Sequence, residues 1–488
     1  QEADEVSIRS RFAIVGALLA LVAGCASIDF AAVPRMPSHA IADGGDTRLG
    51  RAIAAEARRR PGESGFAVLE SGLDAFVARA ALADLAERTL DLQYYIVHGD
   101  VSGRLLIGSL FDAAERGVRV RLLIDDWTLA DADEALAQLD AHPAIEIRLF
   151  NPLTGRSWVD PARWADLVGD FSRINRRMHN KAWIADNVAA VVGGRNIGDE
   201  YFQARDDLDY HDLDLLSVGP VVNALSSSFD RYWNSEFSVP LSAFLRLPPD
   251  PERLDAMRSW FAGQSRDAAG TPYAESLANA ELARALREGS LRLAWGDARV
   301  IADDPDKLRL SEDDPRLRAS QRGLLLAGQL SELAPKPRSE LLVVAPYFVP
   351  GATGVDSFGM LEREGVSVRI LTNSLMSSDV LPAQAGYARY REALLEAGVE
   401  LNELKPSGLG RDERPRRRDP IGGSSRAALH EKSLVIDREV VFVGSPNLDP
   451  RSIRTNTEVG VLVRSSDLAA QVAAIFERNA SPQRAYRV

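Results

Sequence analysis

Residues 176–186 read RRMHNKAWIAD, and residues 428–437 read ALHEKSLVID. Both segments contain the pattern H-x-K-x-x-x-x-D. Each is followed by a turn of small residues that ends in asparagine, GGRN at 193–196 and GSPN at 444–447. The chain has only six histidines, so two of them in matching motifs are unlikely to coincide by composition alone. The repetition predicts that the two motifs act together.

The spacing within each motif has a structural meaning if the segments are strands. Side chains two residues apart leave a strand on the same face, so each histidine points with its lysine. The two aspartates are expected at hairpin turns between apolar strands. The candidate catalytic residues are therefore His179, Lys181, Asp186, His430, Lys432 and Asp437.

The rest of the chain is duplicated as well. A strand–helix–strand pattern at 90–124 recurs at 341–372, at nearly the same offset as the motifs. Alternating strands and helices imply a largely parallel sheet. We expect an α/β fold of two lobes packed face to face, each a mixed, mainly parallel sheet flanked by helices, with the two motifs meeting between them. The predicted divisions are a first lobe at 49–235, an inter-lobe region at 236–322 and a second lobe at 323–488.

The N-terminal residues resemble a targeting segment. Arg9 and Arg11 precede an apolar run at 12–26, which is short for a membrane span and typical of a signal peptide. Residues 21–25, LVAGC, resemble a lipoprotein processing site, with Cys25 as the lipidated residue. The pattern predicts a signal peptide at 1–25, a tether at 26–48 and a lipoprotein on the membrane of the bacterial cell envelope, facing the periplasm. The alternative is an uncleaved anchor or a buried helix that carries an incidental cysteine.

Two segments precede the histidines and could contact lipid. Residues 151–177 interleave tryptophan and phenylalanine with arginine, which suits lipid headgroups at a membrane interface. A packed cover on the lobe is the equal alternative. Residues 406–426 are rich in arginine and glycine and are expected to form a solvated loop, or a lid. The net charge of −12 argues against a bulk nucleic-acid partner.

The paired motifs, together with GGRNIGDEY at 193–201, APYFVPG at 345–351, LTNSL at 371–375 and FVGSPNLDPRS at 442–452, resemble the phospholipase D superfamily and its bacterial cardiolipin synthase C branch. The resemblance implies a phosphatidyltransferase that forms cardiolipin from two phospholipids, such as phosphatidylglycerol and phosphatidylethanolamine, through a covalent phosphohistidine. It favours His179 as the nucleophile. A phospholipase D-type hydrolase, either a lipase or a nuclease, uses the same residues. A catalytically silent envelope-binding protein would not need both motifs complete.

The residue types suit phosphodiester chemistry. A neutral imidazole can attack phosphorus, and a protonated one can protonate the leaving alkoxide. The two lysines, with Asn196 and Asn447, are expected to bind the phosphoryl oxygens. Because the lysines supply positive charge and H-x-K is a poor zinc pattern, no metal or other cofactor is predicted.

Each imidazole also needs an acceptor for its second nitrogen. We expect Glu458 to orient His430 of its own repeat and Asp212 to orient His179, with Asp214 as the near rival of Asp212.

Overall fold

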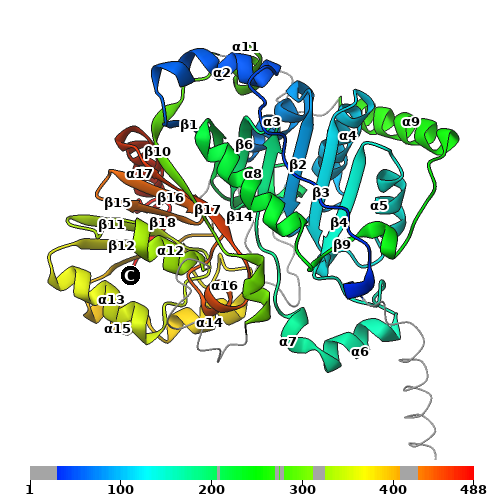
Figure 1. The fold of residues 1–488 in the computed structure, drawn as a ribbon. Coiled ribbons are helices and arrows are strands. Elements are labelled where there is room, and N and C mark those ends of the chain that lie inside the picture. The colour runs from blue at the N-terminus through cyan, green and yellow to red at the C-terminus, as the bar shows by residue number, and fades with distance from the viewer. Residues whose placement is uncertain are drawn as a thin grey trace, which may run out of the picture.

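The structure is a computed structural model, and it describes residues 30–205, 209–269, 274, 280–288, 290–310, 325–406 and 427–488. Its centre is one sheet of 16 strands, in the order β18-β13-β12-β11-β15-β16-β17-β10-β1-β8-β6-β5-β2-β3-β4-β9. The order is symmetric about the antiparallel pair β1–β10, so each half of the sheet is one repeat. The two repeats lie side by side, blue to green and yellow to red in Figure 1. The expected duplication is confirmed.

Each repeat has the same strand plan. Three parallel strands, β2, β3 and β4 or β11, β12 and β13, lie beside an antiparallel meander that carries the motif. In the first repeat the strands are β1 (Ser64–Leu69), β2 (Thr89–Tyr94), β3 (Arg119–Asp125), β4 (Ile145–Phe150), β5 (Ala182–Ala185), β6 (Ala189–Gly193), β8 (Asp214–Val218) and β9 (Ser238–Pro240). In the second they are β10 (Ala294–Ala302), β11 (Glu340–Val344), β12 (Ser367–Asn373), β13 (Glu400–Leu404), β15 (Ser433–Ile436), β16 (Val440–Gly444), β17 (Val459–Arg464) and β18 (Ala485–Arg487).

The sheet is mixed, as expected, but most of its pairings are antiparallel. Parallel pairing is confined to the strands joined by crossover helices, whereas the motif strands are joined by tight hairpins, which only antiparallel strands permit. The hairpin turns fall at Asp186-Asn187 and Asp437-Arg438, where all four residues have positive φ, as a type I′ turn requires. The predicted turns are confirmed.

The expected inter-lobe region takes part in the sheet. Strand β10 lies within 236–322 and pairs with β1 of the first repeat and β17 of the second. Strand β10 occupies in the second repeat the place that β1 has in the first, so that repeat begins earlier than sequence position 323. The sequence has no continuous apolar run for this strand, because its middle residues, 297–300, are exposed or half-buried and include Asp297 and Arg299.

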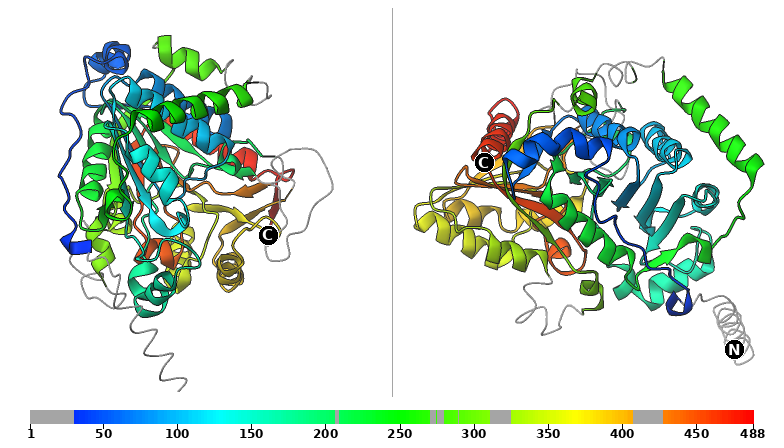
Figure 2. Two further views of the ribbon diagram at one scale, coloured as in Figure 1. Left: turned by 90° about the vertical axis from the view of Figure 1, so that its right-hand side faces the viewer. Right: turned by 45° about the horizontal axis from the view of Figure 1, so that its top comes forward.

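Helices flank the sheet (Figures 1 and 2). The two halves share one apolar cluster that includes Phe229 and Trp233 from α8 and Leu468 and Phe476 from α17, so they form a single packed body. The helices are α2 (Arg48–Arg59), α3 (Gly72–Leu85), α4 (Val101–Glu115), α5 (Asp133–Asp140), α6 (Pro161–Gly169), α7 (Phe171–Ile174), α8 (Pro220–Trp233), α9 (Pro251–Ala268), α11 (Glu281–Glu288), α12 (Leu326–Leu333), α13 (Gly351–Arg363), α14 (Leu381–Ala388), α15 (Arg391–Glu396), α16 (Pro450–Arg454) and α17 (Ser466–Asn479), with short 3-10 turns η1 (Phe30–Ala32), η2 (Asp126–Thr128), η3 (Asp199–Tyr201), η4 (Leu241–Ala243) and η5 (Pro305–Arg309).

The described part of the expected tether is packed against the first lobe. The Arg35 guanidinium donates to the backbone oxygens of Glu236 and Ser238, and Arg121 donates to the backbone oxygen of Ser38. Residues 30–47 therefore belong to the folded body. The expected signal peptide, Cys25 and nearly all of the 406–426 loop lie outside the described residues. Within the described residues, no helix combines the length and the apolarity needed to cross a membrane.

Candidate active site

The fold brings the two motifs to one place. Each histidine lies just before the first strand of its hairpin, β5 or β15, at the edge where the neighbouring strand β2 or β11 ends. His179 donates its backbone N–H to the carbonyl oxygen of Thr457 at 2.8 Å. His430 does the same to His211 at 2.8 Å, where β14 (Ala427–Leu429) pairs in parallel with β7 (Asp209–His211). Each motif is thus hydrogen-bonded to the other repeat.

The orienting carboxylates are exchanged between the repeats. Glu458 Oε2 lies 2.8 Å from His179 Nδ1, and Asp212 Oδ2 lies 2.5 Å from His430 Nδ1. The two carboxylates expected from the sequence are found, but each contacts the histidine opposite to the one expected. The reason is the cross-repeat pairing, because Glu458 follows Thr457 and Asp212 follows His211, the residues that bind the other motif's backbone. Asp214, the rival of Asp212, forms a buried ion pair with Arg79.

The two carboxylates differ in charge state. Burial raises the pKa of Glu458 to about 7, against the opposing effect of Lys181 and two serine hydroxyls, Ser445 and Ser452. Burial would also raise the pKa of Asp212, but His430 and Lys432 outweigh it and hold that pKa below its usual value. Asp212 is therefore ionised at neutral pH, whereas Glu458 is poised near half ionisation.

Both imidazoles are buried among cations. Burial and then the charge of Lys181 lower the pKa of His179 well below its usual value, and burial and then Lys432 lower that of His430. Without substrate both rings are neutral at pH 7. A bound phosphodiester would offset the surrounding positive charge and allow one ring to hold a proton.

The lysines are fixed by their own motifs. Lys181 Nζ donates to the backbone oxygen of His179 at 2.7 Å, and Lys432 Nζ donates to that of His430. Each ammonium also faces a tyrosine ring, Tyr95 at 5.5 Å and Tyr347 at 6.0 Å from the ring centre. Burial lowers both lysine pKa values, that of Lys181 more strongly.

The two expected phosphate-binding asparagines are not equivalent. Asn196 is engaged on both sides, since its Oδ1 accepts from the Ile96 N–H at 3.2 Å and its Nδ2 donates to the Tyr201 hydroxyl at 2.9 Å. Asn447 Oδ1 is buried without a hydrogen-bond partner. Asn447 also lines, with Lys432, a pocket whose other walls are mostly apolar. Its amide is the freer of the two to meet a ligand.

Asp186 and Asp437 lie away from the histidines. Asp186 ends the strand that His179 precedes, and its carboxylate accepts the backbone N–H groups of Glu87, Arg88 and Thr89 at 2.8 to 2.9 Å. Asp437 accepts the equivalent N–H groups of 338–340. These contacts tie each hairpin to the start of strand β2 or β11. A strand of this length places its two ends on opposite edges of the sheet, so each aspartate lies at the far end of β5 or β15 from its histidine. A catalytic role for the two aspartates stays a prediction.

Sequence reasoning missed the residues that surround the imidazoles. Four tyrosine rings lie near them: Tyr95 has its centre 5.1 Å from His179, and Tyr201, Tyr210 and Tyr347 have theirs at 5.4, 5.1 and 6.5 Å from His430. Tyr95 comes one residue after β2, whereas Tyr347 comes three residues after β11. At the 251-residue offset of the motifs Tyr95 aligns with Pro346, so a comparison of the repeats gives no signal for this pair.

Two further missed residues hold the motif segments in place. Asp125, at the end of β3, accepts the Met178 N–H at 2.8 Å and pairs with Arg177. Asn373, at the end of β12, exchanges hydrogen bonds with the backbone of Leu429, each 3.0 Å long. The sequence contains this signal too, since both end matching apolar strands, LLID and ILTN.

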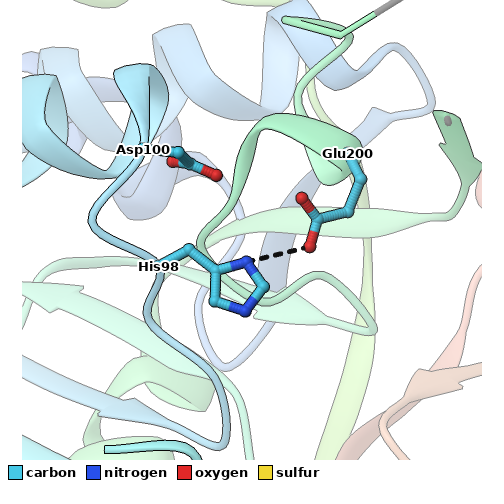
Figure 3. Close-up of side chains that lie close together, drawn as sticks. All are labelled: His98, Asp100 and Glu200. Atoms are coloured by element: carbon cyan, nitrogen blue, oxygen red, sulfur yellow. Dashed lines mark ion pairs between the residues drawn. The ribbon is translucent and has the colours of Figure 1, made fainter. Parts of the chain in front are cut away.

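One other group could hold a cation. Among the described residues, His98, Asp100 and Glu200 bring ligand atoms within 4.8 Å of one another (Figure 3). His98 Nδ1 lies 3.1 Å from Glu200 Oε1, so these two already form an ion pair when the ring is protonated. Asp100 caps α4 through Gly103 and accepts the Asp199 N–H. Its oxygens are therefore engaged, and the group has a structural explanation without a metal.

The matches to known proteins agree with this two-repeat arrangement. The family model described as "Cardiolipin synthase, PLD-like domain" matches residues 80–233 and 330–480, one match in each repeat. The chain belongs to this phospholipase D-like cardiolipin synthase family. The matched ranges contain both histidines, both lysines and both exchanged carboxylates, and they make the chain a member of a family of phosphatidyltransferases.

Individual relatives agree with the family. Cardiolipin synthase C of Escherichia coli (strain K12) is 42% identical over 425 residues, which is 86% of each chain. Cardiolipin synthase A of Pseudomonas syringae pv. syringae is 23% identical, covering 84% of this chain and 67% of that protein. The crystal structure of phosphatidylserine synthase from Haemophilus influenzae Rd KW20 aligns over 90% of this chain and 92% of its own, with a TM-score of 0.55 at 14% identity. That likeness shows the shared fold.

Proposed function

We propose that this protein transfers a phosphatidyl group from one phospholipid to an alcohol on a second phospholipid and so forms cardiolipin. The observation that carries the proposal is the exchanged pairing of histidines and carboxylates. With Nδ1 of each ring held by Glu458 or Asp212, each Nε2 is left for the substrate. The 42% identity to a cardiolipin synthase C supports the lipid substrate.

The residues support a two-step displacement. In the first step His179 Nε2 forms a bond to phosphorus and the phosphorus–oxygen bond to the leaving alcohol breaks, while His430 gives that oxygen a proton. In the second step His430 removes a proton from the acceptor hydroxyl. The acceptor oxygen then bonds to phosphorus and the nitrogen–phosphorus bond breaks.

The environments of the two rings support this division of roles. His179 has the more strongly lowered pKa and is held neutral by burial and the nearby lysines, as a nucleophile must be. His430 is paired with Asp212, whose lowered pKa keeps it ionised, and an ionised partner stabilises the imidazolium of a general acid.

The surroundings of the site support a lipid substrate. The pocket beside Lys432 and Asn447 is lined mostly by leucine, isoleucine, valine and phenylalanine, which suits the apolar part of a lipid. Phosphatidylglycerol and phosphatidylethanolamine are the phospholipids we propose. We also propose that the protein acts on the membrane of the bacterial cell envelope, as a lipoprotein facing the periplasm and anchored through Cys25.

The test is the product spectrum. Purified protein is added to vesicles of phosphatidylglycerol, with and without phosphatidylethanolamine, and the lipids are measured by mass spectrometry. We expect cardiolipin to accumulate and to require both histidines. Phosphatidic acid as the main product, with acceptor lipid abundant, would replace transfer by hydrolysis. Cleavage of nucleic acid but not of lipid would assign the site to a nuclease.

A further inference from the structure

Helix α6 has its polarity reversed relative to an ordinary surface helix. Its residues Trp164 and Val168 are 55% and 86% exposed, and Phe171, at the start of α7, is 60% exposed. Trp164 and Val168 share one side of α6 because they are four residues apart. Phe171 follows the break in helical backbone at Asp170. Just before the helix, Trp158 is 50% and Val159 is 88% exposed. An apolar stripe thus faces outward.

The polar residues of the same helix face the protein. Arg163 is 1% exposed, donates to the Trp127 carbonyl oxygen and stacks on the Trp158 ring at 4.2 Å. Asp166 accepts the Thr154 N–H and hydroxyl, and Asp160 caps the helix by accepting the Ala162 N–H. The sequence folds this way because these polar groups are satisfied inside, which leaves tryptophan, valine and phenylalanine for the outer side.

The segment that carries the reversed helix leads along the chain into the active site. Strand β4 ends at Phe150, and the segment that follows carries α6 and α7 and runs directly into Arg177 and His179. The second lobe has a matching feature, since Leu375 and Met376 follow β12 and are 61% and 48% exposed. Both segments follow strands that end at the edge where the histidines lie. In Figure 1 helices α6, α7, α14 and α16 all lie along the lower side of the molecule.

Basic side chains accompany the apolar stripe. Arg451, at the start of α16, donates to the side chain and the backbone of Asn175, just after α7. Arg451 and Arg454 are both exposed there, beside the exposed Ile453. Exposed tryptophan with neighbouring arginine is the composition that favours the interface of a bilayer with anionic headgroups.

We propose that α6, with Trp158, Trp164, Val168 and Phe171, inserts into the lipid interface and places the active site at the membrane surface. The occupant of this apolar face is a bilayer containing anionic phospholipid. The proposal rests on the proposed function, because a phospholipid keeps its acyl chains in the bilayer while its phosphate reaches the histidines. It adds a second point of membrane contact, at the site itself.

Insertion is tested by fluorescence quenching on the full-length protein. Vesicles of phosphatidylglycerol and phosphatidylethanolamine carry bromine on their acyl chains, which quenches tryptophan within the bilayer. The variant W158F/W164F keeps the apolar stripe but removes its indoles. Trp260 on α9, which is 48% exposed, supplies the control variant W260F. We expect clear quenching of the wild type and of W260F and at least half of it lost in W158F/W164F. Equal quenching in all three proteins would overturn the proposal.

Catalysis gives an independent readout. We expect V168S/F171S to lose about tenfold of its activity on vesicles, since two apolar side chains no longer bind the interface. Its activity on a short-chain phospholipid dissolved as monomers should equal that of the wild type. The matched control is L333S/M360S, which changes side chains that are 49% and 46% exposed on α12 and α13.

Full vesicle activity of V168S/F171S would overturn the proposal. So would a wild-type dimer that this variant breaks in sedimentation, because a second copy would then cover α6. No activity of the wild type on either form of phospholipid would overturn the proposed function, while the quenching result would stand by itself.

Discussion

Glu458 binds Nδ1 of His179 at 2.8 Å, although the two residues lie 279 positions apart and belong to different repeats. The mirror contact, Asp212 with His430, spans 218 positions. Neither repeat alone therefore contains an oriented imidazole. Each lobe supplies the carboxylate that orients the other lobe's histidine. The site therefore requires the two repeats to be packed together.

This exchange predicts which histidine each carboxylate controls. Glu458→Gln should disturb the Nδ1 resonance of His179 and leave that of His430 in place, whereas Asp212→Asn should do the reverse. Nitrogen-15 NMR of the imidazoles measures both. Each variant should lose on the order of 10²- to 10⁴-fold in kcat, since an unoriented imidazole presents the wrong tautomer. A shift at the histidine of the same repeat would contradict the exchanged pairing.

The two histidine variants should differ in whether a covalent phosphatidyl adduct forms on the remaining histidine. His179→Ala and His430→Ala are each expected to abolish turnover while keeping the fold, as checked by circular dichroism. If His179 is the nucleophile, a phosphatidyl adduct should be found by mass spectrometry on His179 in the slow His430→Ala variant. An adduct on His430 in the His179→Ala variant would reverse the roles.

The pH dependence should follow Glu458. Its pKa of about 7 means that its carboxylate, which accepts Nδ1–H of His179, forms only as the pH rises through that value. The rate at low substrate should therefore rise through about pH 7, and Glu458→Gln should remove this limb of the profile. If the low rate of the variant still rises through pH 7, the ionisation of Glu458 is not the source of this pH dependence.

The folding stability should fall as the pH rises, whereas the rate should increase. The folded state raises the Glu458 pKa above its usual value near 4.5, so the neutral form favours folding. This contribution is full below about pH 4.5 and is lost as the pH rises to about 7. The melting temperature of the wild type should fall over this window relative to that of Glu458→Gln. Parallel curves for the two proteins would contradict this.

Asp186 should matter for stability more than for chemistry. Its buried carboxylate accepts three backbone N–H groups, so Asp186→Ala removes three hydrogen bonds and leaves the buried N–H of Thr89 unpaired, which should cost on the order of 3 kcal/mol of unfolding free energy. Thermal denaturation measures the loss. The kcat of the remaining folded fraction, counted by active-site titration, should stay within about threefold of wild type. A loss comparable to that of His179→Ala would return Asp186 to the chemistry.

Turnover should withstand chelation. Lys181 and Lys432 supply the positive charge that a metal would otherwise bring to the phosphoryl group. We expect full activity after dialysis against EDTA, and the same for His98→Ala, which opens the His98, Asp100 and Glu200 group. Activity lost to EDTA and restored by a divalent ion would refute the metal-free mechanism. The His98 variant would then show whether that group holds the ion.

The sequence by itself determined the parts of this protein that depend on local spacing. The patterns in RRMHNKAWIAD and ALHEKSLVID are enough to place a strand directly after each histidine and lysine, and to place Asp186 and Asp437 in turns. The near-constant offset between the two copies is enough to show the duplication. These inferences hold because strand geometry and turn chemistry act over only a few residues.

Only the tertiary structure decided how the copies combine. A sequence comparison aligns Glu458 with Asp212 and assigns each to its own repeat. The contact is instead made across the lobe interface, because β7 pairs with β14 and Thr457 pairs with the His179 segment. Contacts between residues more than 200 positions apart leave no trace in local periodicity. For residues 151–177 the sequence left lipid contact and a packed cover as equal alternatives, since a helical pattern shows which residues share a face but not which face meets the protein. The exposure of Trp164 and Val168 on α6 comes only from the tertiary structure.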